Sequence, residues 1–259
     1  MKKFCFTVDD NIRFLRELTE SSSKSIFDHP YANMYKGLHE KYGVAVQLNL
    51  FFEEKGYTLC NVTDRFKDEW EANSDWLKLS FHSKLENVKP YEFSEYDEVY
   101  EDCSNVHREI LRFATPNTLA KTTTVHYCRA TEDGLRALRD CGVEGLLGLY
   151  GTEENPRSSY QSTPEDDIAI RRGKVVTRNG IAYAGIDIVL NLFSVEEILA
   201  KLSKLSDRDL VKIMIHEQYF YEDYASYQPN FEQKLDKSFE YLINNDFKSD
   251  FFENIINNK

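Results

Sequence analysis

Two adjacent carboxylates, Asp9 and Asp10, follow directly after an apolar, β-prone run at residues 4–8. An amphipathic helical pattern begins immediately afterwards, at Ile12. In α/β proteins, side chains at such a strand-to-helix transition lie at the carboxyl ends of the strands, where ligands bind. One carboxylate can hold a cation while the other accepts a proton. The alternative is that one of them only caps the helix that follows.

Three histidines occupy equivalent places further along the chain. His82 follows an expected strand at 76–81, His126 lies near the end of one at 122–128, and His216 follows one at 210–215. Because the carboxyl ends of parallel strands lie on one side, we expect these rings to share a site with the two aspartates. Imidazole and carboxylate together suit Zn²⁺, Fe²⁺ or Co²⁺.

Each histidine also has a simpler interpretation. His82 and Glu86 are four residues apart, so on one turn of a helix both could bind the same ion. The alternative is a histidine at the end of a strand with a surface glutamate nearby. His216 is followed by Glu217. Its alternative interpretation is a structural histidine in the core or at the rim, with its ring hydrogen-bonded. His126 stands in an apolar strand and is expected to be buried and structural. The remaining histidines are not expected to be ligands: His29, His39 and His107.

Apolar strand-like runs alternate with helix-like segments along most of the chain. The expected strands are 3–8, 44–52, 76–81, 122–128, 145–150, 186–192 and 210–215. The expected helices are 11–22, 32–42, 92–113, 131–140, 194–205 and 230–246, with a polar tail after the last. A β-ribbon turning at Asn179–Gly180 is expected within 167–184. This rhythm predicts a mainly parallel sheet covered by helices, open or closed into a barrel.

The composition limits the classes of function. The chain has 259 residues and a net charge of −12, which argues against binding nucleic acid through a basic face or docking on anionic membranes. Its five cysteines are scattered, without the spacing of a disulfide framework or a zinc-thiolate site. Neither a signal peptide nor a membrane span is recognisable, so a reducing cytoplasm is the expected location. We expect one domain over 1–259, with the ribbon as an insertion.

Three short segments resemble the motifs of polysaccharide deacetylases, carbohydrate esterase family four. Thr7-Val-Asp-Asp-Asn11 resembles the family's Thr-Phe-Asp-Asp-Gly, and Phe81-His-Ser-Lys-Leu-Glu86 resembles its His-Ser/Thr-x-x-His. Ile213-Met-Ile-His216 resembles its late Leu-x-His. The segments occur in the family's order, and the resemblance covers residues 3–246.

This resemblance implies a distorted seven-stranded (β/α) barrel that removes an N-acetyl group from a carbohydrate by means of metal-activated water. Asp9 would be the general base and His216 the general acid. Asp10 and His82 would ligate the metal, and Glu86 would stand where the family has its second histidine. That ligand set still holds a divalent ion, with zinc expected first and manganese, iron or cobalt as alternatives.

The chain also departs from the family's pattern. The Arg-x-Pro-x-Gly motif is replaced by residues 125–130, so His126 is a candidate substitute or extra ligand, and the fourth motif is reduced to residues 185–187. One alternative is therefore an inactive barrel that binds carbohydrate or acts as a scaffold. Another is a glycoside hydrolase on a related barrel, using Asp9 with Asp187 or Glu217. The sequence leaves the substrate and the oligomeric state open.

Overall fold

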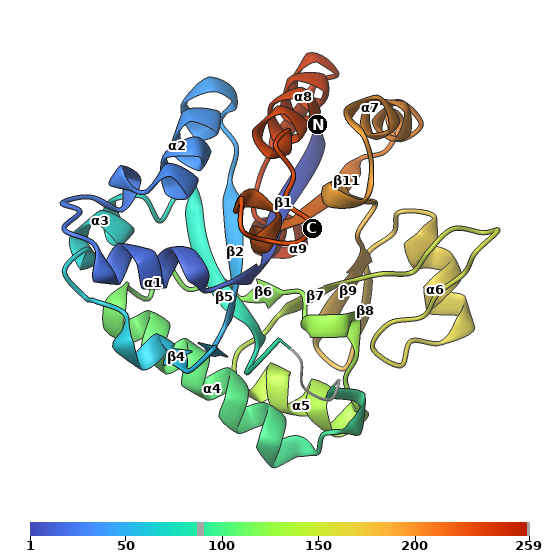
Figure 1. Cartoon of the computed structure of the whole chain (residues 1–259). Coiled ribbons are helices and arrows are strands. Elements are labelled where there is room, and N and C mark those ends of the chain that lie inside the picture. The colour runs from blue at the N-terminus through green and yellow to red at the C-terminus, as the bar shows by residue number, and fades with distance from the viewer. Residues whose placement is uncertain (87–90, 258–259) are drawn as a thin grey trace.

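The computed structural model describes residues 1–86 and 91–257, and its main strands form two sheets (Figure 1). The first has the parallel order β10-β11-β1-β2-β5, with β12 also paired to β1. Its strands are β1 (Lys2–Asn11), β2 (Val46–Phe51), β5 (Leu77–Ser83), β10 (Ile188–Val189), β11 (Leu210–His216) and β12 (Phe247–Ser249). The second has the order β6-β7-β9-β8, in which β8 alone is antiparallel to its neighbour. Its strands are β6 (Thr122–Thr123), β7 (Gly145–Gly148), β8 (Val176–Arg178) and β9 (Ile181–Gly185), and a separate hairpin joins β3 (Glu53–Glu54) to β4 (Tyr57–Thr58).

The two sheets join at both edges. At one edge, Leu79 of β5 donates a backbone hydrogen bond to Thr118 and accepts one from Ala120, just before β6. At the other, the chain runs from β9 into β10, and the backbone N–H of Asp187 between them donates to Lys212 of β11. The two sheets therefore close into a ring of strands. It has seven positions, which are taken by β1, β2, β5, β6, β7, β9 with β10, and β11. The fold is therefore the distorted seven-stranded α/β barrel that the sequence predicts.

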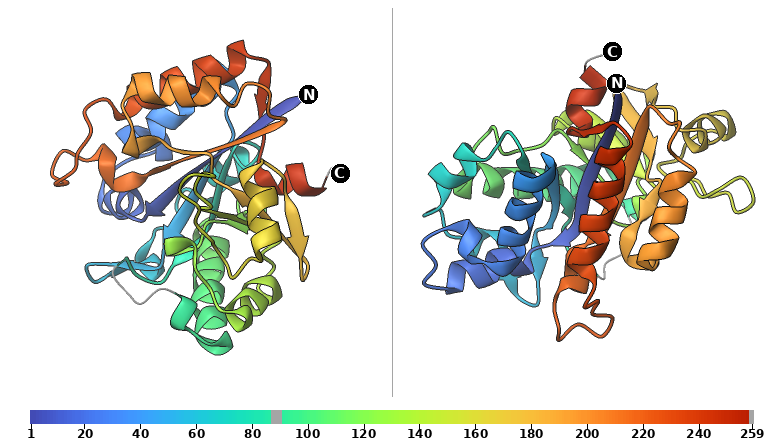
Figure 2. Two further views of the ribbon diagram at one scale, coloured as in Figure 1. Left: turned by 90° about the vertical axis from the view of Figure 1, so that its right-hand side faces the viewer. Right: turned by 90° about the horizontal axis from the view of Figure 1, so that it is seen from above.

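Helices lie outside the strands (Figure 2). They are α1 (Arg13–Glu20), α2 (Pro30–Tyr42), α3 (Lys67–Ala72), α4 (Tyr96–Phe113), α5 (Glu132–Asp140), α6 (Pro164–Arg171), α7 (Val195–Ser203), α8 (Phe231–Asn244) and α9 (Phe252–Asn257). Short 3₁₀ turns include η4 (His126–Cys128), η5 (Leu190–Leu192) and η6 (Glu217–Phe220). A capping box of Ser194 and Glu197 opens α7, and Gly43 ends α2 at a φ of 66°. Within residues 1–86 and 91–257, no helix combines the length and apolar character needed to cross a bilayer.

The side chains of β1 alternate between two environments. Phe6 faces outward onto α8, where its ring centroid lies 5.1 Å from that of Phe239. Thr7 and Asp9 are also buried, at 1 % exposure each, but they lie on the opposite face of the strand, inside the barrel. Because both faces of β1 are covered, nearly all of its side chains are shielded from solvent.

The interior of the barrel is lined by polar side chains that satisfy one another. Gln47 of β2 donates to the Thr122 carbonyl of β6 and accepts from the Thr122 hydroxyl, although these strands are not neighbours in the ring. Ser80 of β5 donates to the same carbonyl. Gln47 also donates to Asn49, which continues toward the carboxyl end of the barrel. This network fixes polar groups that would otherwise be costly to bury.

The segment expected to be a β-ribbon is only partly one. Strands β8 and β9 form the predicted hairpin around Asn179–Gly180, and β9 pairs with β7 in the barrel as well. Residues 164–171 form α6 instead of an arm of the ribbon. Thr163 caps this helix, Pro164 fits its first turn, and three acidic residues follow there, all of which favour a helix start.

The tail after α8 contains further structure. Residues 247–249 form β12 beside β1, and residues 252–257 form α9. The rings of Phe247 and Phe252 are almost completely buried, and Glu253 pairs with Lys78 of β5 at 2.5 Å. The expectation of a polar tail was therefore wrong, because the three phenylalanines of this segment, Phe247, Phe251 and Phe252, are buried.

Candidate metal centre

A bulge at the end of β1 turns two consecutive carboxylates toward one site. The pairing of β1 with β2 shifts in register between Val8 and Asn11, and Asp10 has a left-handed φ of 64°. In a regular strand, Asp9 and Asp10 would point to opposite faces. The bulge removes that restriction, so that Asp9 faces the interior while Asp10 reaches the mouth of the barrel.

The side chain of Asn11 braces this bulge. Its amide donates to the Val8 carbonyl at 2.6 Å and to the Asn49 carbonyl at 3.2 Å, and its oxygen accepts from the Tyr31 hydroxyl at 2.7 Å. Left-handed backbone at a residue other than glycine costs about 1–3 kcal/mol, and it persists where surrounding contacts enforce it. Asn11 therefore holds Asp10 in position.

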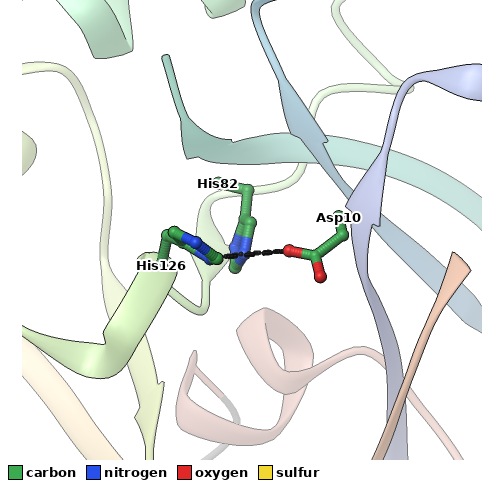
Figure 3. Close-up of side chains that lie close together, drawn as sticks. All are labelled: Asp10, His82 and His126. Carbon is green, nitrogen blue, oxygen red and sulfur yellow. Dashed lines mark hydrogen bonds and ion pairs between the residues drawn. The ribbon is translucent and has the colours of Figure 1, made fainter. Parts of the chain in front are cut away.

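Asp10, His82 and His126 converge on one point at the mouth of the barrel (Figure 3). Nε2 of His82 lies 3.0 Å from Oδ1 of Asp10 and 3.1 Å from Nδ1 of His126. Nδ1 of His126 is 3.5 Å from the same oxygen. A tetrahedral ion with ligand bonds of ~2.0–2.1 Å separates its ligand atoms by about 3.3 Å. The spacing of the three atoms therefore fits a zinc-like ion.

The hydrogen bonds made by the rest of each side chain leave Nε2 of His82 and Oδ1 of Asp10 facing each other. Nδ1 of His82 donates to the Thr124 carbonyl, so in the neutral ring Nε2 carries a lone pair. Oδ1 of Asp10 is buried without a hydrogen bond of acceptable geometry. These facing atoms require positive charge between them. A proton on the His82 ring supplies it when the site holds no ion, because Asp9 and Asp10 raise the pKa of His82 against the effect of burial, and a divalent cation supplies it otherwise.

The electrostatics of the site agree with this interpretation. Although burial acts in the opposite direction, the His82 ring lowers the pKa of Asp10 by its hydrogen bond and charge when it carries that proton, and Asp10 stays ionised. Burial and the neighbouring His82 charge lower the pKa of His126 to about 4, so this ring is neutral near pH 7. A carboxylate and a neutral imidazole are the protonation states that metal ligands need.

His126 does not lie in a strand, as the sequence suggests. Strand β6 ends at Thr123, because the Thr124 carbonyl accepts from His82 and the Val125 N–H donates to the Tyr160 hydroxyl. Residues 126–128 form η4, in which Tyr127 has a φ of 63°. This turn directs His126 into the mouth of the barrel, so the expectation that His126 lies in an apolar strand was wrong.

Glu86 stands beside the three-residue cluster. His82 belongs to the extended strand β5, so the helical i, i+4 relation with Glu86 does not exist. The backbone of Glu86 hydrogen-bonds His126, whereas its carboxylate is not among the groups that converge within 4.8 Å. Burial, followed by the charges of Asp10 and Glu54, raises the pKa of Glu86. The third residue of the converging group is thus His126, and a role of Glu86 as a ligand stays a prediction.

Asp9 lies below the cluster, inside the barrel. Its Oδ1 accepts from the Asn49 amide at 2.7 Å, and its Oδ2 is 4.0 Å from Nδ1 of His82. Burial raises the pKa of Asp9, although the charges of His82 and His216 oppose this effect. Such a carboxylate has a greater affinity for a proton than one in water, which suits a general base.

His216 lies next to Asp9, its partner in the β1–β11 register. Nδ1 of His216 is 2.8 Å from the side-chain oxygen of Asn191 in η5. Because that oxygen only accepts, Nδ1 carries a hydrogen and Nε2 is the atom available to a substrate. Gln218 donates to Oδ2 of Asp10 at 2.7 Å. No pattern in the sequence pointed to either amide, because each reaches its partner only through the pairing of neighbouring strands.

A cavity of about 110 Å³ adjoins Asp10 at this mouth. Its lining is mostly charged: Asp10, Ile12, Arg13, Phe51, Glu54, Lys55, Glu86, Glu217, Gln218, Asp223 and Tyr224. Glu217 serves a different purpose there, because it accepts from the backbone N–H groups of Ile12, Arg13 and Phe14 and so caps α1. It anchors the end of β11 to the helix that follows Asp10.

No protein-family model matches this sequence, and no curated protein does. Solved structures match in shape. A family 4 acetyl xylan esterase from Clostridium thermocellum, in complex with a cobalt ion, aligns at a TM-score of 0.52 and 12% identity over 99% of this chain and 91% of its own. The protein has the fold of the family 4 carbohydrate esterases.

Two further structures share this fold. A 4-α-glucanotransferase from Thermococcus litoralis aligns at a TM-score of 0.62 and 13% identity over all of this chain, which spans 41% of the enzyme's length. A CE4 family pseudoenzyme from Bacillus anthracis aligns at a TM-score of 0.52 and 10% identity over 98% of this chain and 65% of its own. At these identities only the fold is what they have in common with this chain.

Proposed function

We propose that this protein is a metal-dependent hydrolase that removes an N-acetyl or similar acyl group from a carbohydrate. One observation carries the proposal: Asp10, His82 and His126 present three acceptor atoms within 4.8 Å of one another at the carboxyl ends of the strands. The fold shared with a family 4 acetyl xylan esterase supports the class of substrate.

The ligand set is Asp10, His82 and His126, which suits zinc first and also Co²⁺, Fe²⁺ or Mn²⁺. A divalent ion bound there lowers the pKa of water and polarises the acyl carbonyl. Thr124 orients His82, and Gln218 orients Asp10, by the hydrogen bonds described above.

The proton transfers are assigned to the two groups beside the cluster. Asp9, with its raised pKa, accepts the proton of the attacking water. His216 donates a proton from Nε2 to the leaving amine, while Asn191 holds the opposite nitrogen. Asp9 and His216 are partners in the β1–β11 register, so neighbouring strands bring the base and the acid to the same end of the barrel.

The charge near the site favours particular carbohydrates. Glu54, Glu86 and Asp223 line the adjoining cavity, and the whole chain carries a net charge of −12. An anionic polymer would be repelled, whereas neutral or amine-bearing sugars would not. We therefore propose N-acetylated oligosaccharides as substrates.

Two measurements test this proposal. Protein purified without added metal should contain close to one divalent ion per chain, and Asp10→Ala or His82→Ala should lose it. The zinc- or cobalt-loaded protein should then release acetate from N-acetylglucosamine oligomers, and Asp9→Asn should abolish release while retaining the ion. Glu222→Gln, an exposed neighbour of the site, is the matched control. Absence of bound metal at micromolar zinc would refute the proposal.

The principal alternative is a barrel that binds carbohydrate without hydrolysing it. The missing family motifs and the likeness to a CE4 family pseudoenzyme favour this alternative. It predicts saturable binding of the oligomers with no acetate released by the metal-loaded protein.

A glycoside hydrolase is less consistent with the structure. Of the carboxylates that could pair with Asp9, Asp187 is bound to Lys212 at 2.8 Å, and Glu217 caps α1. Release of new reducing ends in place of acetate would identify a glycoside hydrolase.

A further inference from the structure

A cluster of two cysteines and a histidine lies between α4 and α5, apart from the candidate metal centre. Cys141 follows the last residue of α5, and its Sγ lies 3.4 Å from Oγ of Ser104 and 3.6 Å from the Tyr100 carbonyl. Tyr100 and Ser104 are one turn apart on α4, and Cys103 belongs to that same turn. The Cys141 sulfur therefore sits over the part of α4 that carries Cys103.

His107 connects the two cysteines. Its Nε2 lies 3.7 Å from Sγ of Cys103, one turn before it on α4, and its ring also hydrogen-bonds the backbone of Cys141. Burial lowers the pKa of His107 to about 4, so the ring is neutral and can accept a proton. Cys103 is fully buried and His107 is 9 % exposed.

The two thiols differ in the way that a peroxide-reactive pair requires. Cys141 is partly exposed, and hydrogen bonds from the Cys103 thiol and then the Ser104 hydroxyl lower its pKa to about 7. Burial and the contact with Cys141 raise the pKa of Cys103 well above its ordinary value. Near neutral pH, Cys141 is thus partly a thiolate that solvent can reach, while Cys103 remains a protected thiol.

We propose that Cys141 and Cys103 form an oxidation-sensitive pair, which hydrogen peroxide converts to a disulfide between α5 and α4. The Cys141 thiolate attacks one peroxide oxygen, the O–O bond breaks, and the departing hydroxide takes a proton to become water, leaving Cys141 as a sulfenic acid. Cys103 then gives its proton to His107 and attacks the Cys141 sulfur. The S–S bond forms as the sulfenic hydroxyl leaves, protonated by His107, as a second water. The pair is oxidised by two electrons and one peroxide is reduced to two waters.

The disulfide would close a loop that carries part of the metal site. Residues 103–141 include β6 and η4, and therefore His126. A cross-link across this segment restricts the unfolded chain more than the native one. The oxidised protein should therefore melt at a temperature several degrees higher than the reduced protein.

Peroxide treatment of the full-length protein, followed by peptide mapping in a mass spectrometer, tests the pair directly. The expected product is a peptide cross-linked through Cys103 and Cys141, two hydrogens lighter than the reduced peptides and restored by dithiothreitol. Cys60 is an internal control, because it is exposed and its thiol has no partner within residues 1–86 and 91–257. It should react more slowly at neutral pH.

Two variants distinguish a pair from independent thiols. In Cys103→Ala, Cys141 should still react first but should proceed to the sulfinic acid, since no thiol resolves it. In Cys141→Ser, Cys103 should resist peroxide, and the rise in melting temperature should disappear. Because Cys141 is at the surface, the second variant is expected to fold even if the buried substitution does not. Equal oxidation rates at Cys60 and Cys141, or sulfinic acid at Cys141 of the wild type without a cross-link, would overturn the inference.

Discussion

Nε2 of His82 and Nδ1 of His126 lie 3.1 Å apart, although one residue is the penultimate residue of strand β5 and the other opens a 3₁₀ turn after β6. The two rings meet because the ends of neighbouring barrel strands lie side by side. With Oδ1 of Asp10 they make a site of three acceptors, which is stable only with positive charge among them. The predictions below depend on this arrangement, on the groups that support it, or on the packing around it.

His126, rather than Glu86, should be the third metal ligand. His126→Ala should weaken zinc affinity by at least ~100-fold, since removal even of an outer-shell partner costs 10–100-fold. Glu86→Gln should change zinc affinity by less than about threefold, because its carboxylate lies outside the converging group. Competition with a chromophoric chelator measures both. The reverse ranking would restore Glu86 as the ligand and show that the cluster changes when metal binds.

Asn191 should act on catalysis through His216 without contributing to metal binding. Asn191→Ala should lower kcat about tenfold or more, since it frees the imidazole to adopt the wrong tautomer, while KM and zinc content stay unchanged. Asn191→Asp keeps the acceptor and adds a negative charge that favours the protonated ring. In that variant, the pH above which activity falls should move upward in a pH–rate profile. An unchanged profile together with lost stability would assign Asn191 a structural role only.

Glu217 should be a major determinant of stability. It is buried, it accepts from three backbone N–H groups at the start of α1, and it accepts from the Tyr221 hydroxyl at 2.9 Å. Because the N-cap residue Ile12 has no capping side chain of its own, Glu217→Ala should lower the free energy of unfolding by about 2–4 kcal/mol. Urea denaturation followed by circular dichroism measures this loss. The exposed neighbour Glu222 supplies the control, and Glu222→Gln should change the value by less than about 0.5 kcal/mol.

His107 should make the protein less stable in mild acid. Its pKa is lowered to about 4 by burial, from an ordinary value of 6.5, so the unfolded chain binds a proton that the folded chain does not in this interval. Stability from this residue is therefore complete above pH 6.5 and falls as the pH decreases toward 4, by about 3 kcal/mol in total. His107→Gln should remove this dependence, as the difference between variant and wild-type unfolding curves at each pH will show. A constant difference from pH 7 to pH 4.5 would contradict it.

Much of the fold could be predicted from local patterns in the sequence. The apolar runs and the amphipathic periodicities identified the strands β1, β2, β5, β7 and β11 and the helices α2, α4, α5, α7 and α8 to within a few residues. Cap residues such as Ser194 and Gly43 have their effect within one turn, so the sequence alone shows them. The short strand β6 was overextended, because the tertiary contacts of Thr124 and Val125 end it.

The sequence by itself determined that Asp9, Asp10, His82 and His216 lie at the ends of strands, because hydrophobic patterning sets where strands stop. Only the tertiary structure decided which side chains meet. The bulge at Asp10 interrupts the alternation of side chains in a regular strand, so both carboxylates reach the site. The turn at Tyr127 places His126 beside them. The extended backbone at His82 means that His82 and Glu86 do not share a helical face. These outcomes depend on contacts with distant residues such as Tyr31 and Tyr160, and such contacts exist only once the barrel has closed.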